Sequence, residues 1–568
     1  MAVMGAHLQP FRLRRLAAVA IGLLALETVL YSLAGAESPA SRGLLPEAPG
    51  GARMAALALG LAVLALTPHV WRGTRTALAL TITALVALAI LSAEHQRGAV
   101  AGLEAGLAVT LVLARSAFPL GCSNRPRPRI VFAALGAWVL AAAALAVAAI
   151  LAPTTGHVIA HVLRPNVLHP GPRLDAGWSS LIELLVGGAL AISVIALRSA
   201  VSPARAHNRH TDHEYRTARS IIDAHATDSL SPFVVRPDKA LAFAAGGVLS
   251  YRVIGGTAVV SADPVAPGDH AGDVLAGFQG QARRHGWQIA VWGAAERHLD
   301  DYRRLGLRAM CVGEEAFVDP AGFSLEGRAV RKLRQSVHRV ARRGWEIVVR
   351  DGRDVDAALE QEIAQLAQRW RLDHPRLHGF AMGMGAYAGE LRPDDLYLLA
   401  RSSDGELGAV MRFVAYGGNL SLDTMQRVGD TPNGLNEALV VRALEVARGR
   451  GIAEVSLNYA GLAHLVRAEP SGRQWRRTLV RMGLRPLHRR FQMDRLVRFN
   501  DKFAPQWRRR YLVYESRSAL PRAVIRVLQA EGYLPHPRPS AVLHRLPRIV
   551  PRPLPDGPRR RGALSEPR

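Results

Sequence analysis

The stretch NLSLDTMQRVGDTPNGLNEALVVRALEVARGRGIAEVSLNYA, Asn419 to Ala460, has the pattern of a strand, a loop, a helix, a turn and a second strand. The first strand alternates as a half-buried strand does, which predicts Leu422 and Thr424 on one face and Asp423 on the other. An apolar run with helical spacing follows at 435–446, and glycines end it. The stretch therefore predicts an α/β unit.

The loop of this stretch ends in turn residues, Pro432-Asn433-Gly434, placed directly before the helix. The first turn of a helix has unpaired N–H groups and therefore favours an anion. Acetyltransferases that use acyl-CoA carry a Gln/Arg-x-x-Gly-x-Gly/Ala loop at this place, and the sequence lacks it. It has instead Asp423 before the loop and Glu437 in the first helical turn. The missing loop argues against a transferase that uses acyl-CoA as its donor.

The whole chain has 568 residues and a formal charge of +26 at pH 7. Its length indicates several units, and its basic balance indicates phosphate-bearing partners, either nucleic acid or anionic lipid. The two cysteines, Cys122 and Cys311, lie far apart in the sequence. They predict neither a disulfide framework nor a cysteine metal site.

Six apolar runs near the length of a bilayer crossing predict a transmembrane domain over residues 1–200. They are Leu16–Gly35, Met54–Val70, Thr76–Leu91, Ala99–Leu113, Ile130–Leu151 and Trp178–Leu197. Arginines gather before the first run, in alternate loops and after the sixth, which predicts a multi-pass protein of the cell membrane with a cytoplasmic N-terminus and C-terminal region. Glu27, Glu104 and Glu183 fall inside these runs, either as carboxylates at the membrane interface or as a polar path for a lipid head group.

The remaining sequence has globular composition after a linker at 201–214. In 215–326, predicted strands at 241–244, 248–254, 257–260 and 287–292 combine with helices at 271–285 and 296–305, a pattern typical of an acetyltransferase-like α/β subdomain. A second subdomain, 345–540, contains the opening stretch and ends in a strand at 511–514 and a helix at 520–531. The Pro- and Arg-rich tail, 541–568, is predicted to be disordered.

A strongly basic helix, 327–344, is predicted between the two subdomains. Val330, Leu333, Val337 and Val340 form an apolar stripe on it. The rest of its surface is basic, with Arg328, Arg331, Lys332, Arg334, Arg339, Arg342 and Arg343. The helix is either a solvated bridge or a phosphate track for an RNA acceptor stem or anionic lipid, and the two interpretations are compatible.

Several separated motifs resemble the catalytic domain of the MprF-type lysyl-phosphatidylglycerol synthases (phosphatidylglycerol lysyltransferases), over about 215–535. The matching residues are Ser421-Leu422-Asp423, Met425, Arg427, Pro432 to Glu437, Ser456-Leu457-Asn458, Gly379-Phe380-Ala381-Met382-Gly383, and Arg498 to Trp507 as R-F-N-x-K-F-x-P-x-W. Two positions depart from the family pattern. Gln426 replaces an arginine that could meet a phosphate bidentately, and His378 stands where the family has an acidic residue.

The resemblance implies tandem acetyltransferase-like (GNAT) subdomains joined by the basic helix. It implies transfer of an aminoacyl group, with lysine the family default, from aminoacyl-tRNA to the head-group hydroxyl of phosphatidylglycerol. That reaction lowers the negative charge of the membrane, underlies antimicrobial peptide resistance, and needs no cofactor or metal. Some actinobacterial relatives carry a fused lysyl-tRNA synthetase after this region. We expect a separate aminoacyl-tRNA synthetase to serve this chain.

The resemblance and the residue types together give the predicted site. Asp423, Glu437 and Asn433 are the expected catalytic residues, with Asp423 either binding the substrate ammonium or acting as base. Substrate binding is expected from Arg427, Asn458, Gly434, Gly379, Phe380 and Met382. The expected phosphate contacts are Arg331, Lys332, Arg334, Arg339, Arg342, Arg343 and Lys502. A membrane-anchored transferase with another acceptor, such as a peptidoglycan precursor or another lipid, and a non-catalytic basic membrane-binding protein remain open.

Overall fold

The computed structural model describes residues 9–33, 50–94, 97–118, 208–328, 330–374, 379–382, 392–461 and 493–535, with isolated residues between 120 and 203. The fifth and sixth predicted spans lie largely outside these residues. Cys122, Glu183, His378 and the tail 541–568 also lie outside them. Cys311 is a free, partly buried thiol.

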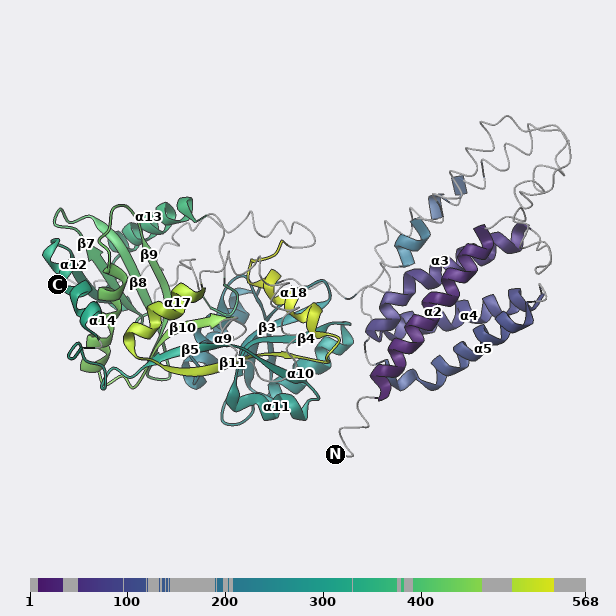
Figure 1. The fold of residues 1–568 in the computed structure, drawn as a ribbon, viewed down its shortest axis with the longest axis horizontal. Coiled ribbons are helices and arrows are strands. Elements are labelled where there is room, and N and C mark those ends of the chain that lie inside the picture. Colours follow the sequence, from purple (N-terminus) through teal and green to yellow (C-terminus); the bar gives the residue numbers. More distant parts are fainter. Residues whose placement is uncertain are drawn as a thin grey trace, which may run out of the picture. The chain divides into compact units, whose positions relative to one another are not determined.

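The first four predicted spans are helical, as their apolar composition predicts. They form α2 (Gln9–Leu33), α3 (Gly50–Arg72), α4 (Arg75–Glu94) and α5 (Gly98–Leu113), which pack around a shared apolar core (Figure 1). By length and composition alone, Arg14–Ser32 and Arg75–Glu94 could cross a membrane, while Ala56–Arg72 and Gly98–Leu113 are shorter.

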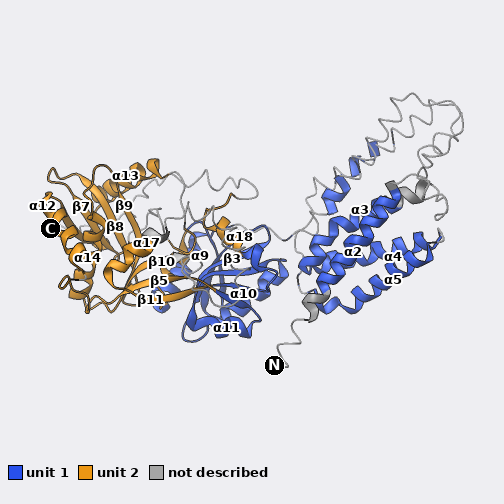
Figure 2. Ribbon diagram, in the orientation of Figure 1, with its two compact units in different colours: residues 1–225, 237–310, 512–523 blue, residues 226–236, 311–511, 524–568 orange. Residues whose placement is uncertain are grey.

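Contacts divide the chain into two compact units (Figure 2). Unit 1 comprises residues 1–225, 237–310 and 512–523, and unit 2 comprises 226–236, 311–511 and 524–568. The last part of the chain thus contributes to both units.

The α/β part of unit 1 begins with α9 (Asp212–His225) and contains the predicted strands and helices. These are β1 (Ala240–Ala244), β2 (Gly247–Ile254), β3 (Thr257–Val265), α10 (Ala271–Arg284), β4 (Gln288–Ala295) and α11 (Leu299–Arg304). The strands β1, β2 and β3 are antiparallel neighbours, and β4 runs parallel to β3 because α10 makes the crossover. The sequence periodicity predicted this part correctly, with β3 and β4 longer than expected.

Unit 2 is built on a mixed sheet. Its elements are the C-terminal part of β5 (Arg308–Val318), α12 (Arg331–Arg342), β6 (Glu346–Asp351), α13 (Ala357–Asp373), β7 (Leu396–Arg401), β8 (Leu407–Tyr416), β9 (Asn419–Arg427), α14 (Leu435–Gly449), β10 (Val455–Gly461), α17 (Met493–Asn500) and most of β11 (Gln506–Tyr514). The strand order within it is β11-β5-β10-β9-β8-β7-β6. The helix α18 (Leu520–Ala530) ends in this unit.

The opening stretch forms β9, α14 and β10, as predicted, although β10 begins at Val455 instead of at Ile452. β10 is parallel to β9 only at Val455 and Ser456, and antiparallel to β5. A helix crossover to a parallel strand that then separates from its neighbour is an acetyltransferase-like arrangement. The prediction of an acetyltransferase-like α/β fold is therefore confirmed for the C-terminal region.

Two apolar layers enclose the sheet of unit 2. On one face, α12 and α14 pack on a core that includes Phe413, Leu422, Leu457 and Ala316. On the other face, α13 packs on Tyr397, Leu399 and Val410. The opening stretch thus lies at the centre of the sheet, with both faces covered.

One prediction about β9 is wrong. The register between β8 and β9 shifts, so that Arg412 faces Thr424 while Phe413 faces Leu422. Residues directly opposite each other share a face, and therefore Thr424 lies on the face opposite to Leu422. The extra residue in this β-bulge is Asp423, which makes Met425, not Thr424, the next residue on the side of Leu422.

Candidate functional site

Polar side chains form a row across one face of the unit 2 sheet. Their chain neighbours Phe413, Leu422, Leu457 and Ala316 belong to the apolar core on the opposite face. Because strand residues alternate, the side chains between them point to the other face. We call this set the polar row: Arg412, Ser421, Asp423, Ser456 and Glu315, every member buried.

Asp423 lies on β9 beside the buried guanidinium of Arg412, which ends the polar row on β8. Nη1 of Arg412 is 3.5 Å from Oδ2 of Asp423, and its Nε donates to Oδ2 of Asp395 at 3.0 Å. Burial raises the pKa of Asp423 to about 6; the charges of Arg412 and Arg236 oppose this rise, and the charge of Asp395 adds to it. A carboxylate with such a pKa is mostly ionised at neutral pH and can still take up a proton.

The segment Gly379–Met382 is fixed by its backbone. The N–H groups of Phe380 and Ala381 donate to the carboxylate of Glu531 at 2.9 and 3.3 Å. Nη1 of Arg236 donates to the carbonyl oxygen of Met382 at 2.6 Å. The side chains of Phe380 and Met382 are buried. The charge of the same Arg236 also favours the ionised form of Asp423.

The turn before α14 makes a second group of predicted site residues. Gly434 has φ +98°, and a Cβ built on it would lie 2.7 Å from the Cβ of Ser336 on α12. Nη1 of Arg339 donates to the carbonyl oxygen of Asn433 at 3.5 Å. Nζ of Lys502 donates to Oε1 of Glu437 at 2.6 Å. The basic helix is thus docked on the predicted anion-binding turn.

The structure therefore places the predicted catalytic residues in two groups. The side chain of Asp423 leaves β9 on the face covered by α13, whereas Asn433 and Glu437 belong to the turn and helix on the other face. Arg427 lies exposed at the end of β9, and the neighbouring Gln426 is buried.

Asn458 lies where β10 departs from regular pairing. The register with β5 shifts between Ser456 and Tyr459, and Asn458 has φ +87° while being buried. Only a few per cent of residues other than glycine adopt such a φ, and asparagine is among those that tolerate it best. This conformation marks the edge at which β10 leaves β9.

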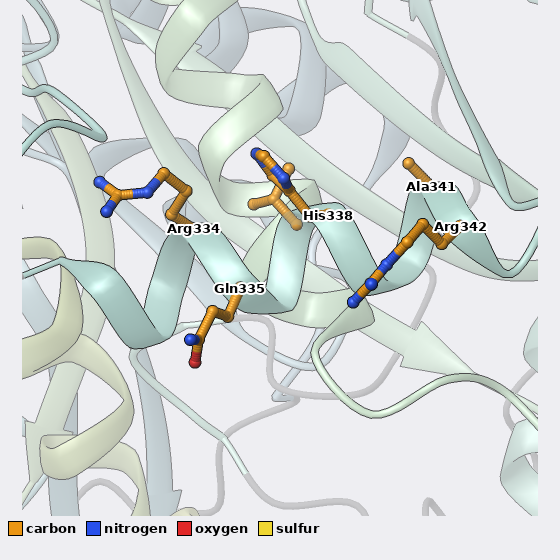
Figure 3. Close-up of a pocket in the computed structure, with 6 residues that line it drawn as sticks. Arg334, Gln335, His338, Ala341 and Arg342 are labelled. Carbon is orange, nitrogen blue, oxygen red and sulfur yellow. The ribbon is translucent and has the colours of Figure 1, made fainter.

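The basic face of α12 is open. Arg331, Lys332, Arg342 and Arg343 are exposed, and within the described part of the chain their side chains have no hydrogen-bond or ion-pair partner. Arg334 instead donates to the carbonyl oxygen of Leu325 at 2.5 Å. Arg334, Gln335, His338 and Arg342 are among the residues that line a shallow cavity of about 510 Å³. Figure 3 shows their side chains extending from the helix. This face of α12 is therefore exposed and positively charged.

Sequence reasoning missed Arg412, Asp395, Arg236 and Glu531. Arg412 lies on β8, and Asp395 lies directly before β7. Which residues they meet depends on how the strands pair, and not on spacing along the sequence. Glu531 lies about 150 residues after the segment that it holds. Among the residues that the structure describes, no group of three His, Cys, Asp or Glu side chains is placed to hold a metal ion.

The family model described as phosphatidylglycerol lysyltransferase, C-terminal, matches residues 219–514. This range contains the polar row, the turn before α14 and the basic helix. The chain belongs to this family. The predicted resemblance to the lysyl-phosphatidylglycerol synthases is thereby confirmed.

Curated relatives of this family are similar over the same region. The lysylphosphatidylglycerol biosynthesis bifunctional protein LysX of Rhodococcus jostii is 34% identical over 370 residues, which cover 63% of this chain and 32% of the relative. LysX of Nocardia farcinica is 32% identical over 379 residues, with 65% and 32% covered. The chain thus spans about a third of the length of these relatives.

A solved structure shares the fold. The structure of L-PGS from Bacillus licheniformis aligns with a TM-score of 0.51 and 21% sequence identity, and the alignment covers 58% of this chain and 99% of that chain. At this identity the likeness concerns the fold alone. The phosphatidylglycerol lysyltransferase family assignment therefore rests on the sequence match.

Proposed function

We propose that the chain is an integral-membrane aminoacyltransferase that moves an aminoacyl group, lysyl by the names of its relatives, from aminoacyl-tRNA to the head-group hydroxyl of phosphatidylglycerol. The observation that carries this proposal is the family match over residues 219–514, which includes both groups of predicted site residues. The tandem arrangement of two acetyltransferase-like subdomains, divided by the basic helix, is part of the proposal.

The proposed reaction exchanges one ester for another. The lipid hydroxyl oxygen bonds to the ester carbonyl carbon, the bond from that carbon to the ribose oxygen breaks, and the hydroxyl proton ends on the leaving oxygen. Asp423 suits this reaction because a carboxylate with a pKa of about 6 can accept a proton near neutral pH or bind an ammonium group. Asn433 and Asn458 are assigned to the ester and the terminal ribose.

The basic helix suits an RNA donor. Arg331, Lys332, Arg342 and Arg343 are exposed on α12, and Arg339 connects that helix to the turn before α14. Several cations on one helical face attract a phosphate backbone without selecting a base sequence. In this proposal α12 and Lys502 bind the tRNA acceptor end.

The N-terminal helices suit a lipid environment. Large apolar side chains point outward from them, among them Leu23 at 64%, Leu103 at 65% and Leu113 at 79% exposed. Exposed leucines on helices that also share an apolar core favour contact with acyl chains. We propose a six-span domain that anchors the enzyme beside phosphatidylglycerol, with the N-terminus and the catalytic region cytoplasmic. The product would reduce the negative charge of the membrane, and with it the attraction of cationic antimicrobial peptides.

The test is lipid analysis of cells that express the chain, followed by the reaction of purified protein with labelled lysyl-tRNA and vesicles of phosphatidylglycerol. We expect a ninhydrin-positive lipid whose hydrolysis releases lysine. Asp423→Asn should reduce it at least about 100-fold. The matched control is Asp404→Asn, the same change at an exposed carboxylate in the turn between β7 and β8.

Two results would overturn the proposal. Label that appears in a peptidoglycan precursor or another lipid, and not in phosphatidylglycerol, would assign a different acceptor. Absence of any labelled product, with folded protein and charged tRNA present, would leave a binding role.

A further inference from the structure

The peptide group between Leu457 and Asn458 is held from both sides. Its N–H, on Asn458, donates to Oγ of Ser456 at 3.2 Å. Its carbonyl oxygen, on Leu457, accepts from Nδ2 of Asn500 at 3.4 Å. All four residues are buried. A peptide fixed in this way stabilises the left-handed conformation of Asn458, which carries a cost for every residue other than glycine.

The hydroxyl of Ser456 is itself oriented by a buried carboxylate. Ser456 and Ser229 both donate to Oε1 of Glu315, each at 2.5 Å. Nε of Arg510 donates to Oε2 of Glu315 at 2.7 Å. Because the proton of Ser456 points to Glu315, a lone pair of its oxygen is left to accept the N–H of Asn458.

Arg510 is held in turn by a second carboxylate. Its two terminal nitrogens donate to the two oxygens of Asp228 at 2.9 and 3.1 Å, a bidentate pair. Nη2 of Arg510 also donates to Oγ of Ser229 at 2.9 Å. We call these five residues the positioning array: Asp228, Ser229, Glu315, Ser456 and Arg510. They come from four separate parts of the chain, and hydrogen bonds connect all of them.

This arrangement does more than hold the strand in place. β10 already pairs with β5 through its backbone, and Val455 and Leu457 anchor it in the apolar core. Burying charged groups seldom adds stability over apolar side chains of similar volume, but it can select one conformation over others. The conformation selected here is the shift in register that turns Asn458 out of regular pairing.

We propose that the positioning array sets the backbone of Asn458 and thereby aims its side chain at the aminoacyl substrate. Glu315, Ser456 and Arg510 are positioning residues that act through Asn458 and do not touch the substrate. The proposal rests on the proposed function, because the substrate role of Asn458 belongs to it.

The first experiment is a double-mutant cycle on the full chain in vesicles. Ser456→Ala should lower kcat/KM for aminoacyl-tRNA about tenfold, the loss expected for one well-placed hydrogen bond. Asn458→Gly should lower it by at least as much, since glycine adopts the same φ unaided but has no side chain to aim. Adding Ser456→Ala to Asn458→Gly should then change kcat/KM less than about twofold. Losses that multiply would overturn the proposal.

The second experiment reads the backbone directly and needs no enzymatic activity. Hydrogen–deuterium exchange of peptides that cover 455–461 should become faster in Ser456→Ala and in Glu315→Gln. The matched control is Ser250→Ala, which removes another fully buried serine hydroxyl, in unit 1 and without a hydrogen-bond partner among the described residues. It should leave exchange at 455–461 and kcat/KM unchanged. Unchanged exchange in Ser456→Ala would contradict the inference, even if the lipid product is never found.

Discussion

Nη1 of Arg412 lies 3.5 Å from Oδ2 of Asp423, and both side chains are buried in the sheet of unit 2. The pair does not compensate fully for the burial of the carboxylate, because the pKa of Asp423 is raised from 3.8 to about 6. A raised carboxyl pKa means that the folded state binds the proton more tightly than the unfolded state does. The carboxyl of Asp423 therefore contributes to the stability of the fold below about pH 4, where it is protonated. This contribution to the free energy of unfolding is lost as the pH rises through 6.

We expect Asp423→Asn to abolish lipid synthesis without destabilising the protein at pH 7.5. The shift of about two pKa units corresponds to a cost on the order of 3 kcal/mol for the ionised wild type at neutral pH, which the amide does not bear. Urea unfolding of the purified protein at pH 5 and pH 7.5 measures this. A variant less stable than the wild type at both pH values would mean that the pair with Arg412 outweighs the burial.

The pH dependence of transfer should follow the same carboxylate. If the reaction needs Asp423 ionised, the rate should fall as the pH drops through about 6. Arg236→Gln removes a charge that favours the ionised form, and the acid limb should move to higher pH by up to about one unit. The measurement is kcat against pH for both proteins. An acid limb at the same pH in both would assign the titration to another group.

Two adjacent aspartates provide a comparison of buried and exposed ion pairs. Asp395 is fully buried and accepts from Arg412 at 2.5 and 3.0 Å, whereas Asp394 pairs with Arg353 at 3.0 Å with both side chains largely exposed. We expect Asp395→Asn to lower the free energy of unfolding by about 3–5 kcal/mol, because it leaves a buried guanidinium undercompensated. Asp394→Asn should cost less than about 1 kcal/mol. Chemical denaturation measures the free energy of unfolding of both variants. Similar losses in the two would contradict the burial of the ion pair between Asp395 and Arg412.

The regular elements around the site could be predicted from sequence, because their apolar residues repeat with the period of a helix or a strand. α14 and α10 follow the predicted ranges for this reason. The β-bulge at Asp423 could not be predicted, since a bulge depends on how β8 and β9 pair and not on the alternation of β9 alone. It reversed the predicted face of Thr424 but left Asp423 on the side opposite to Leu422.

The buried charges were beyond sequence reasoning for a different reason. Arg510 belongs to a run of arginines, which by composition indicates basic surface, yet it is buried beside Glu315, 195 residues earlier in the chain. Lys502 and Glu437 both belong to recognised motifs, but their pairing joins segments 65 residues apart. Spacing along a chain carries little information on such long-range partners. Only the tertiary fold brings them together.

The basic face of α12 should bind RNA through charge. Arg342→Gln combined with Arg343→Gln removes two exposed cations, and we expect weaker tRNA binding. The magnitude of the slope of log K against log salt should decrease by about 1.5, because each lost phosphate contact contributes about 0.7 to 0.9 to that slope. Arg303→Gln with Arg304→Gln on α11 changes the net charge equally and is the control. Filter binding at several salt concentrations compares them, and equal effects would indicate an unspecific response to net charge.

The contact between α12 and the turn before α14 can be tested with two glycines. Gly434 and Gly429 both have positive φ, +98° and +70°, so alanine is strained at either position. Around Gly429 a Cβ would meet nothing within 4 Å, whereas at Gly434 it would lie 2.7 Å from the Cβ of Ser336. Gly429→Ala should therefore lower the free energy of unfolding by about 1–2 kcal/mol, and Gly434→Ala by at least about 1 kcal/mol more.

The same substitution should also affect function, because it pushes the basic helix away from the turn that it contacts. We expect Gly434→Ala to lose tRNA binding and transfer, and Ser336→Gly to restore part of both by removing the two nearest atoms that the new Cβ would meet, Cβ and Oγ of Ser336. Urea unfolding, tRNA binding and lipid synthesis of the three variants form the measurement. If Gly434→Ala and Gly429→Ala lose the same stability, and Ser336→Gly restores nothing, then the strain is confined to the backbone and α12 is not held by this turn.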